Sequence, residues 1–325
     1  MKPSILKPYI LTGTFLCLIS VGCARVDTAR SIRSYENTLS DSSPSDTTVT
    51  DVAADRDGQG RQAALLSAFY GLDDALATGA DQVICDGATG KDGMPVIFSH
   101  EIDVESMQAG DFQVTSASGK VGKILCVTLA PADDKGELRT ALLAGDFGDI
   151  TDQPVKVEIT GNLLSIDKIL NFKGASVDVI SLERGPTMVW AEVVREDEWD
   201  LGKEASPLPW GGGSGAPEGT QQVVRVTWAG GVTKPGGDEA DDVERAQYKV
   251  TVLLEDGSQT EVIPFALADL GDGDNNHELC LDVAGTPLSV SFPAGFLTDP
   301  RDDLNPETEI EVGSSDEYQR TLGRM

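Results

Sequence analysis

Basic residues are scarce in this sequence. Its 325 residues include 25 Lys and Arg against 54 Asp and Glu, which gives a formal net charge of −29. Phosphate backbones repel a chain this acidic, so no nucleic-acid partner is expected. Apolar residues still make up 40 % of the chain, enough to build hydrophobic cores and too many for a chain disordered throughout.

Residues that build catalytic or zinc sites are also few. His100 and His277 are the only histidines, and neither has a second His or Cys at the spacing of a zinc site. Ser214 lies one residue short of a G-x-S-x-G motif, because Ala216 replaces the last Gly. Its Gly- and Pro-rich surroundings are also unlike the strand–turn–helix elbow of that motif. We therefore predict that the protein is not an enzyme.

Long hydrophobic runs are missing too. The apolar segment 9–21 is shorter than the roughly 20 residues that a membrane-spanning helix needs. It follows two lysines and precedes a small residue, as in a secretory signal. No later segment has enough continuous apolar residues to span a bilayer.

The end of this segment, Ile19-Ser20-Val21-Gly22-Cys23, resembles the bacterial lipobox, although Ser20 replaces the usual aliphatic residue. The resemblance implies that residues 1–22 are removed and that Cys23 is lipidated. Ala24, in place of Asp, then points to the outer membrane, with the lipid chains as the membrane contact. The alternative is ordinary cleavage after Ala24 and secretion.

Composition divides the exported chain. Residues 23–60 are rich in Ser, Thr and Asp without apolar periodicity, which predicts a disordered tether. From there the sequence predicts one sandwich over 61–185, a second with acidic loops over 186–315, and a tail over 316–325. A Gly- and Pro-rich stretch at 207–219 predicts a long exposed loop or a hinge.

Most of the chain reads as short strands bounded by turn residues, which favours an all-β fold. The predicted strands are 95–98, 112–115, 121–129, 155–159, 188–194, 223–228, 248–254 and 288–292. Ala- and Leu-rich segments at 62–70 and 138–143 favour two short helices instead.

The two halves resemble one another, which predicts two tandem copies of one β-sandwich. The matching pairs are 97–99 with 226–228, 112–115 with 248–251, 129–134 with 267–272, Glu137-Leu138 with Glu278-Leu279, and 154–160 with 287–292.

The first copy also resembles a known family. Pro95-Val96-Ile97-Phe98-Ser99-His100-Glu101-Ile102-Asp103, Ser106, and Gly110-Asp111-Phe112-Gln113-Val114-Thr115 are similar to bacterial Ig-like modules of surface-layer and cell-envelope proteins. The resemblance covers residues 64–179, and the second copy matches only loosely. It implies Ig-like sandwiches without catalytic residues, which serve spacing, adhesion or ligand presentation.

Three cysteines remain in the folded part. An exported protein oxidises paired cysteines, and Cys85 and Cys126 both lie in the first copy. We predict a disulfide between them. Cys280 is then a lone thiol within an apolar run, expected in the core.

Acidic loops of the second copy offer oxygen ligands for calcium. The candidate ligands are Asp269, Asp272, Asp274, Asn276, Asp299 and Asp302. The register of an EF-hand fails, because His277 occupies the glycine position counted from Asp272. The alternative is a solvated turn whose Asp and Asn side chains cap their own backbone.

Together these features predict a non-catalytic, lipid-anchored envelope protein that serves binding, adhesion or structural spacing, with an envelope protein or polysaccharide as its partner. The alternative is a carbohydrate-binding or hydrolytic protein that uses the loops of the second copy. Of the four tryptophans in the chain, Trp190 and Trp228 lie in predicted strands and are expected in the core.

Overall fold

The computed structural model describes residues 62–199, 215–271 and 273–313. The predicted signal, Cys23, the tether, Trp210, Ser214, Asp272 and the tail lie outside these residues. The described chain is almost entirely β-structure, as predicted, and folds into sandwiches. None of its helices is long and apolar enough to cross a membrane.

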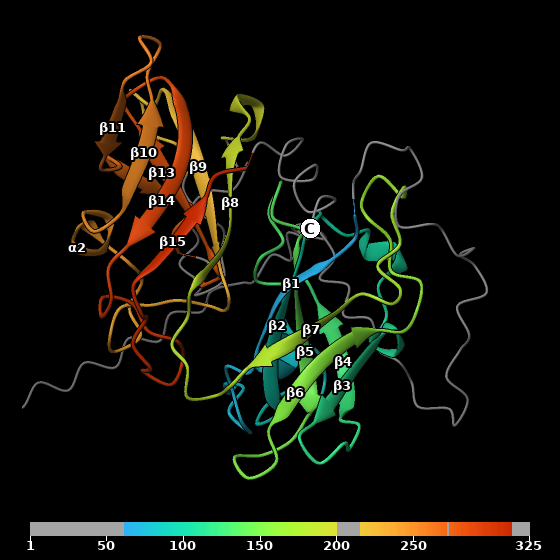
Figure 1. The fold of residues 1–325 in the computed structure, drawn as a ribbon. Coiled ribbons are helices and arrows are strands. Elements are labelled where there is room, and N and C mark those ends of the chain that lie inside the picture. Colours follow the sequence, from blue (N-terminus) through green and yellow to red (C-terminus); the bar gives the residue numbers. More distant parts are fainter. Residues whose placement is uncertain (1–61, 200–214, 272, 314–325) are drawn as a thin grey trace, which may run out of the picture. The chain divides into compact units, whose positions relative to one another are not determined.

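The first β region, residues 62–182, contains seven strands in the order β3-β6-β7-β1-β2-β5-β4 (Figure 1). They are β1 (Leu65–Phe69), β2 (Asp92–Phe98), β3 (Phe112–Ser116), β4 (Lys123–Thr128), β5 (Thr140–Asp146), β6 (Pro154–Ile159) and β7 (Ser176–Ile180). The parallel pair β1–β7 joins the layer β1-β2-β5-β4 to the layer β3-β6-β7. One sheet therefore supplies both layers of this sandwich.

The second β region, residues 188–313, contains eight strands in two sheets, β12-β13-β9-β8 and β11-β10-β14-β15. The strands are β8 (Met188–Val194), β9 (Gln222–Trp228), β10 (Lys249–Leu253), β11 (Gln259–Val262), β12 (Ala266–Ala268), β13 (Asn276–Leu281), β14 (Thr286–Phe292) and β15 (Thr308–Glu311). A parallel bridge between Glu192 and Gly313 connects the two sheets.

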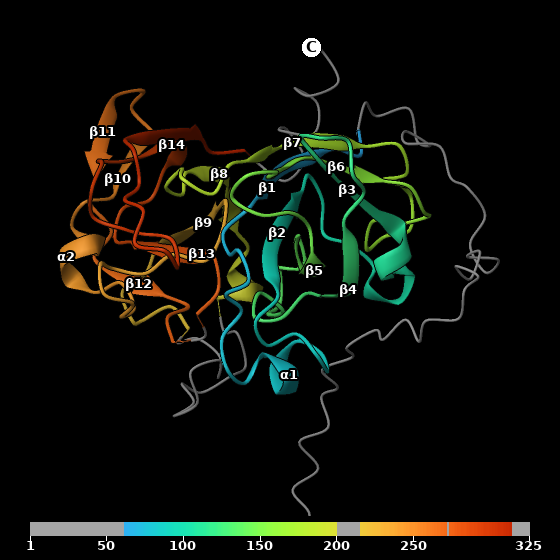
Figure 2. The same ribbon diagram turned by 90° about the horizontal axis from the view of Figure 1, so that it is seen from below.

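Helices are short and lie in connections. They are α1 (Ala80–Val83), α2 (Asp242–Arg245) and the 3-10 turns Val104–Ser106, Ala109–Asp111 and Glu196–Glu198. Asp241 caps α2 by accepting a hydrogen bond from the Val243 N–H, as an N-cap aspartate does. Figure 2 shows α2 beside β12.

The strand order is the same in both regions. The layer β1-β2-β5-β4 corresponds to β8-β9-β13-β12, and β3-β6-β7 corresponds to β10-β14-β15, with β11 added at the edge. The parallel contact between the first and last strands also recurs. This common order supports the repeat that the matching segments predict.

Each region has its own hydrophobic core, and each core contains an aromatic cluster. Phe98, at the end of β2, meets the ring of Phe172 at 4.9 Å between centroids. In the second region Phe292 lies 4.5 Å from Tyr248 and 5.4 Å from Trp228. The Phe98–Phe172 and Phe292–Trp228 pairs meet edge to face, and such pairs contribute about 0.5–1.5 kcal/mol beyond their area. Trp190 and Trp228 are both buried, as expected.

The two predicted helices are wrong. Residues 65–69 form β1 and residues 140–146 form β5, and both strands pair with β2. Most of their residues are buried on both faces. A strand covered on both faces has a nearly continuous apolar sequence, which composition alone does not separate from a buried helix.

Candidate functional site

A row of charged side chains crosses one sheet of the second region. The pairing register places Glu192 of β8 opposite Arg225 of β9, and Arg225 opposite Glu278 of β13. Side chains directly opposite one another on neighbouring strands lie on the same face. All three are buried.

Both faces of this sheet are covered. Val224, Val226 and Leu279 point into the core of the second region. Because side chains alternate along a strand, Arg225 and Glu278 point the other way. There Arg225 meets the loop between β4 and β5 of the first region, where its guanidinium donates to the carbonyls of Gly136 at 2.8 Å and Lys135 at 3.3 Å.

Arg225 also has three carboxylate partners. It donates to Glu278 Oε1 at 2.7 Å, and its Nε lies 3.4 Å from Glu137 Oε1. Its Nη1 lies 3.7 Å from Glu192 Oε1. Burial opposes the charge of the guanidinium, but the carboxylates outweigh this and raise the Arg225 pKa. The arginine therefore remains charged and joins the two regions.

A second arginine, Arg139, extends from the first region to the second. Arg139, just before β5, donates from Nη2 to both carboxylate oxygens of Glu192 at 3.2 Å. Its guanidinium carbon lies 4.3 Å from the ring centre of Trp190, a cation–π contact. Its Nη1 donates to the carbonyls of Phe98 and Ser99 at 3.4 and 3.3 Å. Packing against a planar ring together with a carboxylate suits arginine better than lysine.

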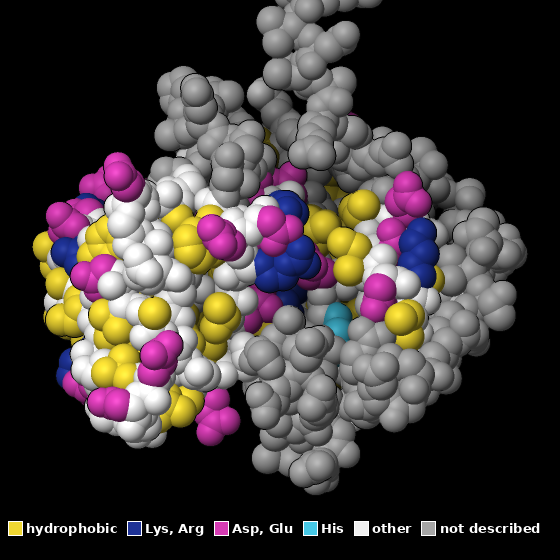
Figure 3. Space-filling view, turned by 90° about the horizontal axis from the view of Figure 1, so that it is seen from above, with side chains coloured by type: hydrophobic (Ala, Val, Ile, Leu, Met, Phe, Trp, Pro, Cys, Tyr) yellow, Lys and Arg dark blue, Asp and Glu magenta, His cyan; other side chains and the backbone are white. Residues whose placement is uncertain are grey.

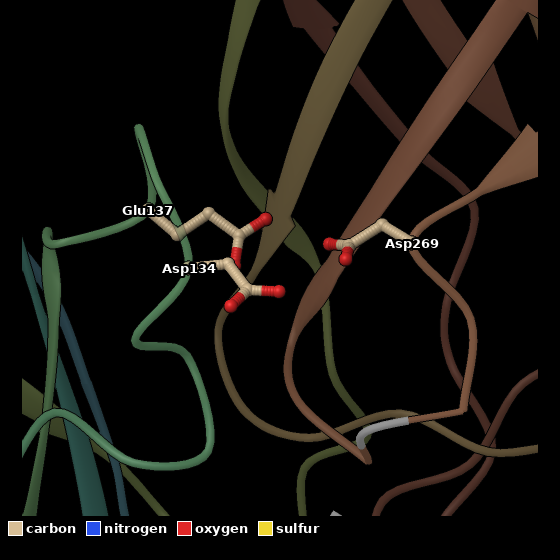
Figure 4. A group of neighbouring side chains, drawn as sticks. All are labelled: Asp134, Glu137 and Asp269. Carbon is tan, nitrogen blue, oxygen red and sulfur yellow. The ribbon is translucent and has the colours of Figure 1, made fainter. Parts of the chain in front are cut away.

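Beside Arg225, three buried carboxylates come together. Asp134 and Glu137 project from the β4–β5 loop, and Asp269 follows β12 (Figure 4). One oxygen from each lies within 4.8 Å of the others. Asp269 has a left-handed backbone, with φ 62°, a conformation uncommon outside glycine and retained where the surroundings enforce it.

Burial is the main influence on the titration of this group. It raises the pKa of Glu137, and the carboxylates of Asp274 and Asp269 raise it further against the opposing charge of Arg225. Burial also raises the pKa of Glu278, to about 7, although Arg225 lowers it. Such shifts arise where desolvation and like charges disfavour the ionised form.

Among the six predicted calcium ligands, Asp269 belongs to this three-carboxylate group. Asp274 accepts hydrogen bonds from the backbone and side-chain N–H groups of Asn276, and the Asn276 side chain accepts another from Thr227. Asp299 accepts from the Arg301 and Asp303 N–H groups in a turn, and Asp302 accepts from Gly236. Within the described residues, none of Asp274, Asp299 and Asp302 belongs to a group of three or more metal-ligating side chains.

The predicted disulfide is confirmed. Cys85 and Cys126 are bonded across a sequence separation of 41, with a Cα–Cα distance of 6.6 Å. Cys280 is a buried free thiol, and burial raises its pKa to about 11. A thiol held in this state is a core residue, not a nucleophile at neutral pH.

Two cavities lie near these contacts. An apolar one of about 180 Å³ includes Phe69, Pro131 and Gly230 in its lining, and a polar one of about 210 Å³ includes His100, Glu101, Arg139, Glu192 and Arg225. On the face drawn in Figure 3, basic side chains lie next to acidic ones and do not form a patch of one sign.

Ser99 and His100 form the pair closest to nucleophilic chemistry, with Ser99 Oγ 2.9 Å from His100 Nδ1. The same hydroxyl accepts a hydrogen bond from the Ala64 N–H and donates to the Gln62 carbonyl. These bonds fix the chain entering β1 against the end of β2. The pair is therefore explained by local structure.

Sequence reasoning missed Arg139, Arg225, Asp134 and Glu137. A signal for two of them was present, because the repeat aligns residues 129–134 with 267–272 and Glu137 with Glu278. In the structure the aligned glutamates both contact Arg225.

Comparisons with known proteins give distant matches. No family model matches the chain, and no curated protein does. The N-terminal part of the bacterial S-layer protein SbsC is similar at 11 % identity, with a TM-score of 0.26, over 78 % of this chain and 44 % of that one. Domains 1-6 of surface layer protein SbsC and the S-layer protein rSbsC(31-844) give 9 and 10 % identity, each with a TM-score of 0.25, over 78 % of this chain and 54 % of theirs. TM-scores this low do not establish a common fold, so the protein's role has to be inferred from its own residues.

Proposed function

We propose that this protein is a non-catalytic component of the bacterial cell envelope, anchored to the outer membrane through lipidated Cys23. Its two β regions serve as one structural or binding unit held away from the lipid. The lipobox-like ending at Cys23 and the tether composition support the anchoring.

The proposal rests on the buried charged side chains, which join the two β regions. Arg225 of the second region donates a hydrogen bond to the Gly136 carbonyl of the first. Arg139 of the first region donates to both carboxylate oxygens of Glu192 in the second. These groups fix one part of the scaffold to the other. Buried ion pairs of this kind add little net stability for the cost of their burial, and a role in fixing geometry is the more common reason to keep them.

A role in sugar stacking is less well supported. Such platforms use exposed aromatic faces, whereas Trp190 and Trp228 are buried, and the Trp228 Nε1–H donates to the Tyr248 hydroxyl at 2.9 Å. Trp199 is half-buried and donates to the Val194 carbonyl. For this reason we place a carbohydrate-binding or hydrolytic role, through the loops of the second region, behind the structural one.

Membrane fractionation tests the anchor. The wild-type protein should be recovered with outer membranes and should incorporate radiolabelled palmitate, and Cys23→Ser should move it to the soluble fraction. Cys280→Ser, which changes a cysteine outside the lipobox-like segment, serves as the control and should leave the fractionation unchanged. Membrane recovery of Cys23→Ser, with no label in the wild type, would contradict the proposal.

A further inference from the structure

We propose that Asp134, Glu137 and Asp269 bind a divalent cation between the two β regions, and that this cation is Ca²⁺. The proposed envelope function does not depend on this site. The site also differs from the ligand set on two acidic loops that the sequence predicts, since only Asp269 is common to both.

The geometry of the three carboxylates fits one ion. Ligand oxygens on Ca²⁺ lie about 2.4 Å from the metal, so two of them are at most about 4.8 Å apart. One oxygen each from Asp134, Glu137 and Asp269 meets this limit, and all three residues are buried. They come from two different loops, so their proximity is not the crowding of neighbours along one acidic segment.

Unsatisfied acceptors provide an independent indication. No amide, guanidinium or hydroxyl group of the described residues donates a hydrogen bond to either carboxylate oxygen of Asp269, although only 1 % of the residue is exposed. The Oε2 atom of Glu278, in the same neighbourhood, has no hydrogen-bond partner among the described residues either. Buried acceptors in native proteins are nearly always satisfied, and one that is not requires an explanation such as an ion.

The carboxylates of the group lie close to one another as well as to Arg225. The carboxylates of Glu137, Asp269 and Glu278 all interact with the guanidinium of Arg225, and Asp134 lies beside Glu137 and Asp269. Arg139 already donates from Nη2 to both carboxylate oxygens of Glu192. Carboxylates buried this close together repel one another, and a divalent cation would offset that repulsion.

The donor set selects the metal. The group offers carboxylate oxygens and no nitrogen or sulfur, which favours a hard cation over zinc or copper. Mg²⁺ requires near-ideal octahedral geometry at shorter distances, whereas Ca²⁺ accepts six to eight oxygens in flexible arrangements. A site assembled from two loops on different sheets suits the more tolerant ion.

The repeat explains how the site arises. The loop before β5 and the loop before β13 occupy the same place in the common strand order, and the sequence match aligns them. Facing each other, they bring their acidic residues to one point. A cation there would fasten equivalent loops of the two regions, beside the contacts of Arg225.

Calcium titration of the full exported chain tests the proposal. After treatment with EDTA and buffer exchange, the wild type should take up a Ca²⁺ ion in native mass spectrometry and should melt at a higher temperature once CaCl₂ is added. Asp134→Asn and Asp269→Asn should each weaken binding by about tenfold or more in calorimetry, because charge count sets affinity. In EDTA both variants should be at least as stable as the wild type, because each removes one of several like charges.

Asp299→Asn is the matched control. Asp299 is also a buried aspartate of the second region, and its Oδ2 has no hydrogen-bond partner among the described residues. Its Oδ1 accepts from the Arg301 and Asp303 N–H groups of a turn, and it belongs to no group of three metal-ligating side chains in the described chain, so Ca²⁺ binding should be retained. Glu137→Gln provides a second cluster variant should either Asn variant fail to fold, as judged by circular dichroism in EDTA. Magnesium at matched ionic strength should give a smaller effect.

Two results would overturn the proposal. One is a wild type that takes up no Ca²⁺. The other is Ca²⁺ binding that survives Asp134→Asn, Glu137→Gln and Asp269→Asn; if Asp299→Asn then abolished it, the ion would lie in the acidic loop. Membrane fractionation of Cys23→Ser is independent of both results, so failure here leaves the envelope function to its own test.

Discussion

The two β regions have the same strand order but are stabilised by different contacts. In the first region a disulfide joins Cys85, after α1, to Cys126 in β4. The second has no disulfide among its described residues, and its one free thiol is buried in β13. Instead, one of its sheets is covered on both faces and carries the charged row Glu192, Arg225 and Glu278.

The comparison shows that the strand topology and the contacts that stabilise each region are determined separately. Alternating and continuous apolar strands give both regions the same order. The covalent and electrostatic contacts that stabilise the two regions are different. The buried arginines, Arg139 and Arg225, lie where one region meets the other, because a surface that covers another surface must satisfy its polar groups there.

The largest effect is expected from removing the central arginine. Arg225→Met should lower the free energy of unfolding by about 3–5 kcal/mol, because buried Glu137 and Glu278 lose their positive partner. Urea unfolding measures the change. Arg195→Met is the control, since the Arg195 side chain is 70 % exposed beside Asp197, and exposed pairs contribute about 0–1 kcal/mol. Equal losses in the two variants would show that the buried row has no special role.

The disulfide should have the next largest effect. Replacing Cys85 and Cys126 with serine should destabilise the first region by about 2–4 kcal/mol, chiefly by freeing the unfolded chain. Urea unfolding of the wild type and of the double variant, each with and without reductant, measures the loss of stability. Reductant should destabilise the wild type and should not change the stability of the double variant. If reductant destabilised the double variant as much as the wild type, the stabilisation would come from elsewhere.

Two glycines give a matched pair. Gly136 and Gly119 both have positive φ, 88° and 86°. A Cβ on Gly136 would lie 2.6 Å from Arg225 Nη1, whereas one on Gly119 would meet nothing within 4 Å. Gly119→Ala should cost about 1 kcal/mol from the backbone alone. Gly136→Ala should cost about 1–3 kcal/mol more because the added methyl crowds the guanidinium. Similar melting temperatures for the two would mean that the loop does not meet Arg225.

The smallest effect concerns Cys280. Its burial and its pKa of about 11 keep the thiolate fraction low at neutral pH, so iodoacetamide should not label it in the native protein and should label it in denaturant. Because this raised pKa lies far above neutrality, labelling should remain slow up to mildly alkaline pH. Rapid native labelling would show that β13 is accessible and would contradict the covered sheet.

Much of the fold could be predicted from the sequence, because strands, turns and the cysteine pair leave local patterns. The paired segments at 97–99 and 226–228 fall at the ends of β2 and β9, the same position in each region. Central strands were harder to predict, since β1 and β5 are apolar on both faces and resemble helices in composition. The acidic loops were interpreted without the first region, which placed all six predicted ligands within two loops of the second region.

The site needed information that no single segment carries. Arg225 lies in an apolar strand, where one charged residue looks like a solvent-facing position, yet it is buried beneath another part of the chain. Asp134 and Glu137 precede β5 as ordinary turn residues. Only the placement of two equivalent loops against one another brings these residues together.

A double-mutant cycle between Glu137 and Arg225 tests most directly that the two regions are joined through buried charge. Glu137→Gln, Arg225→Met and the double variant would be compared by urea unfolding in excess EDTA. The contact between Nε and Oε1 at 3.4 Å predicts a coupling energy of about 1.5 kcal/mol or more, as for close buried charge pairs. Additive losses, with a coupling energy of about zero, would contradict the account, because they would mean that Arg225 and Glu137 are not in contact.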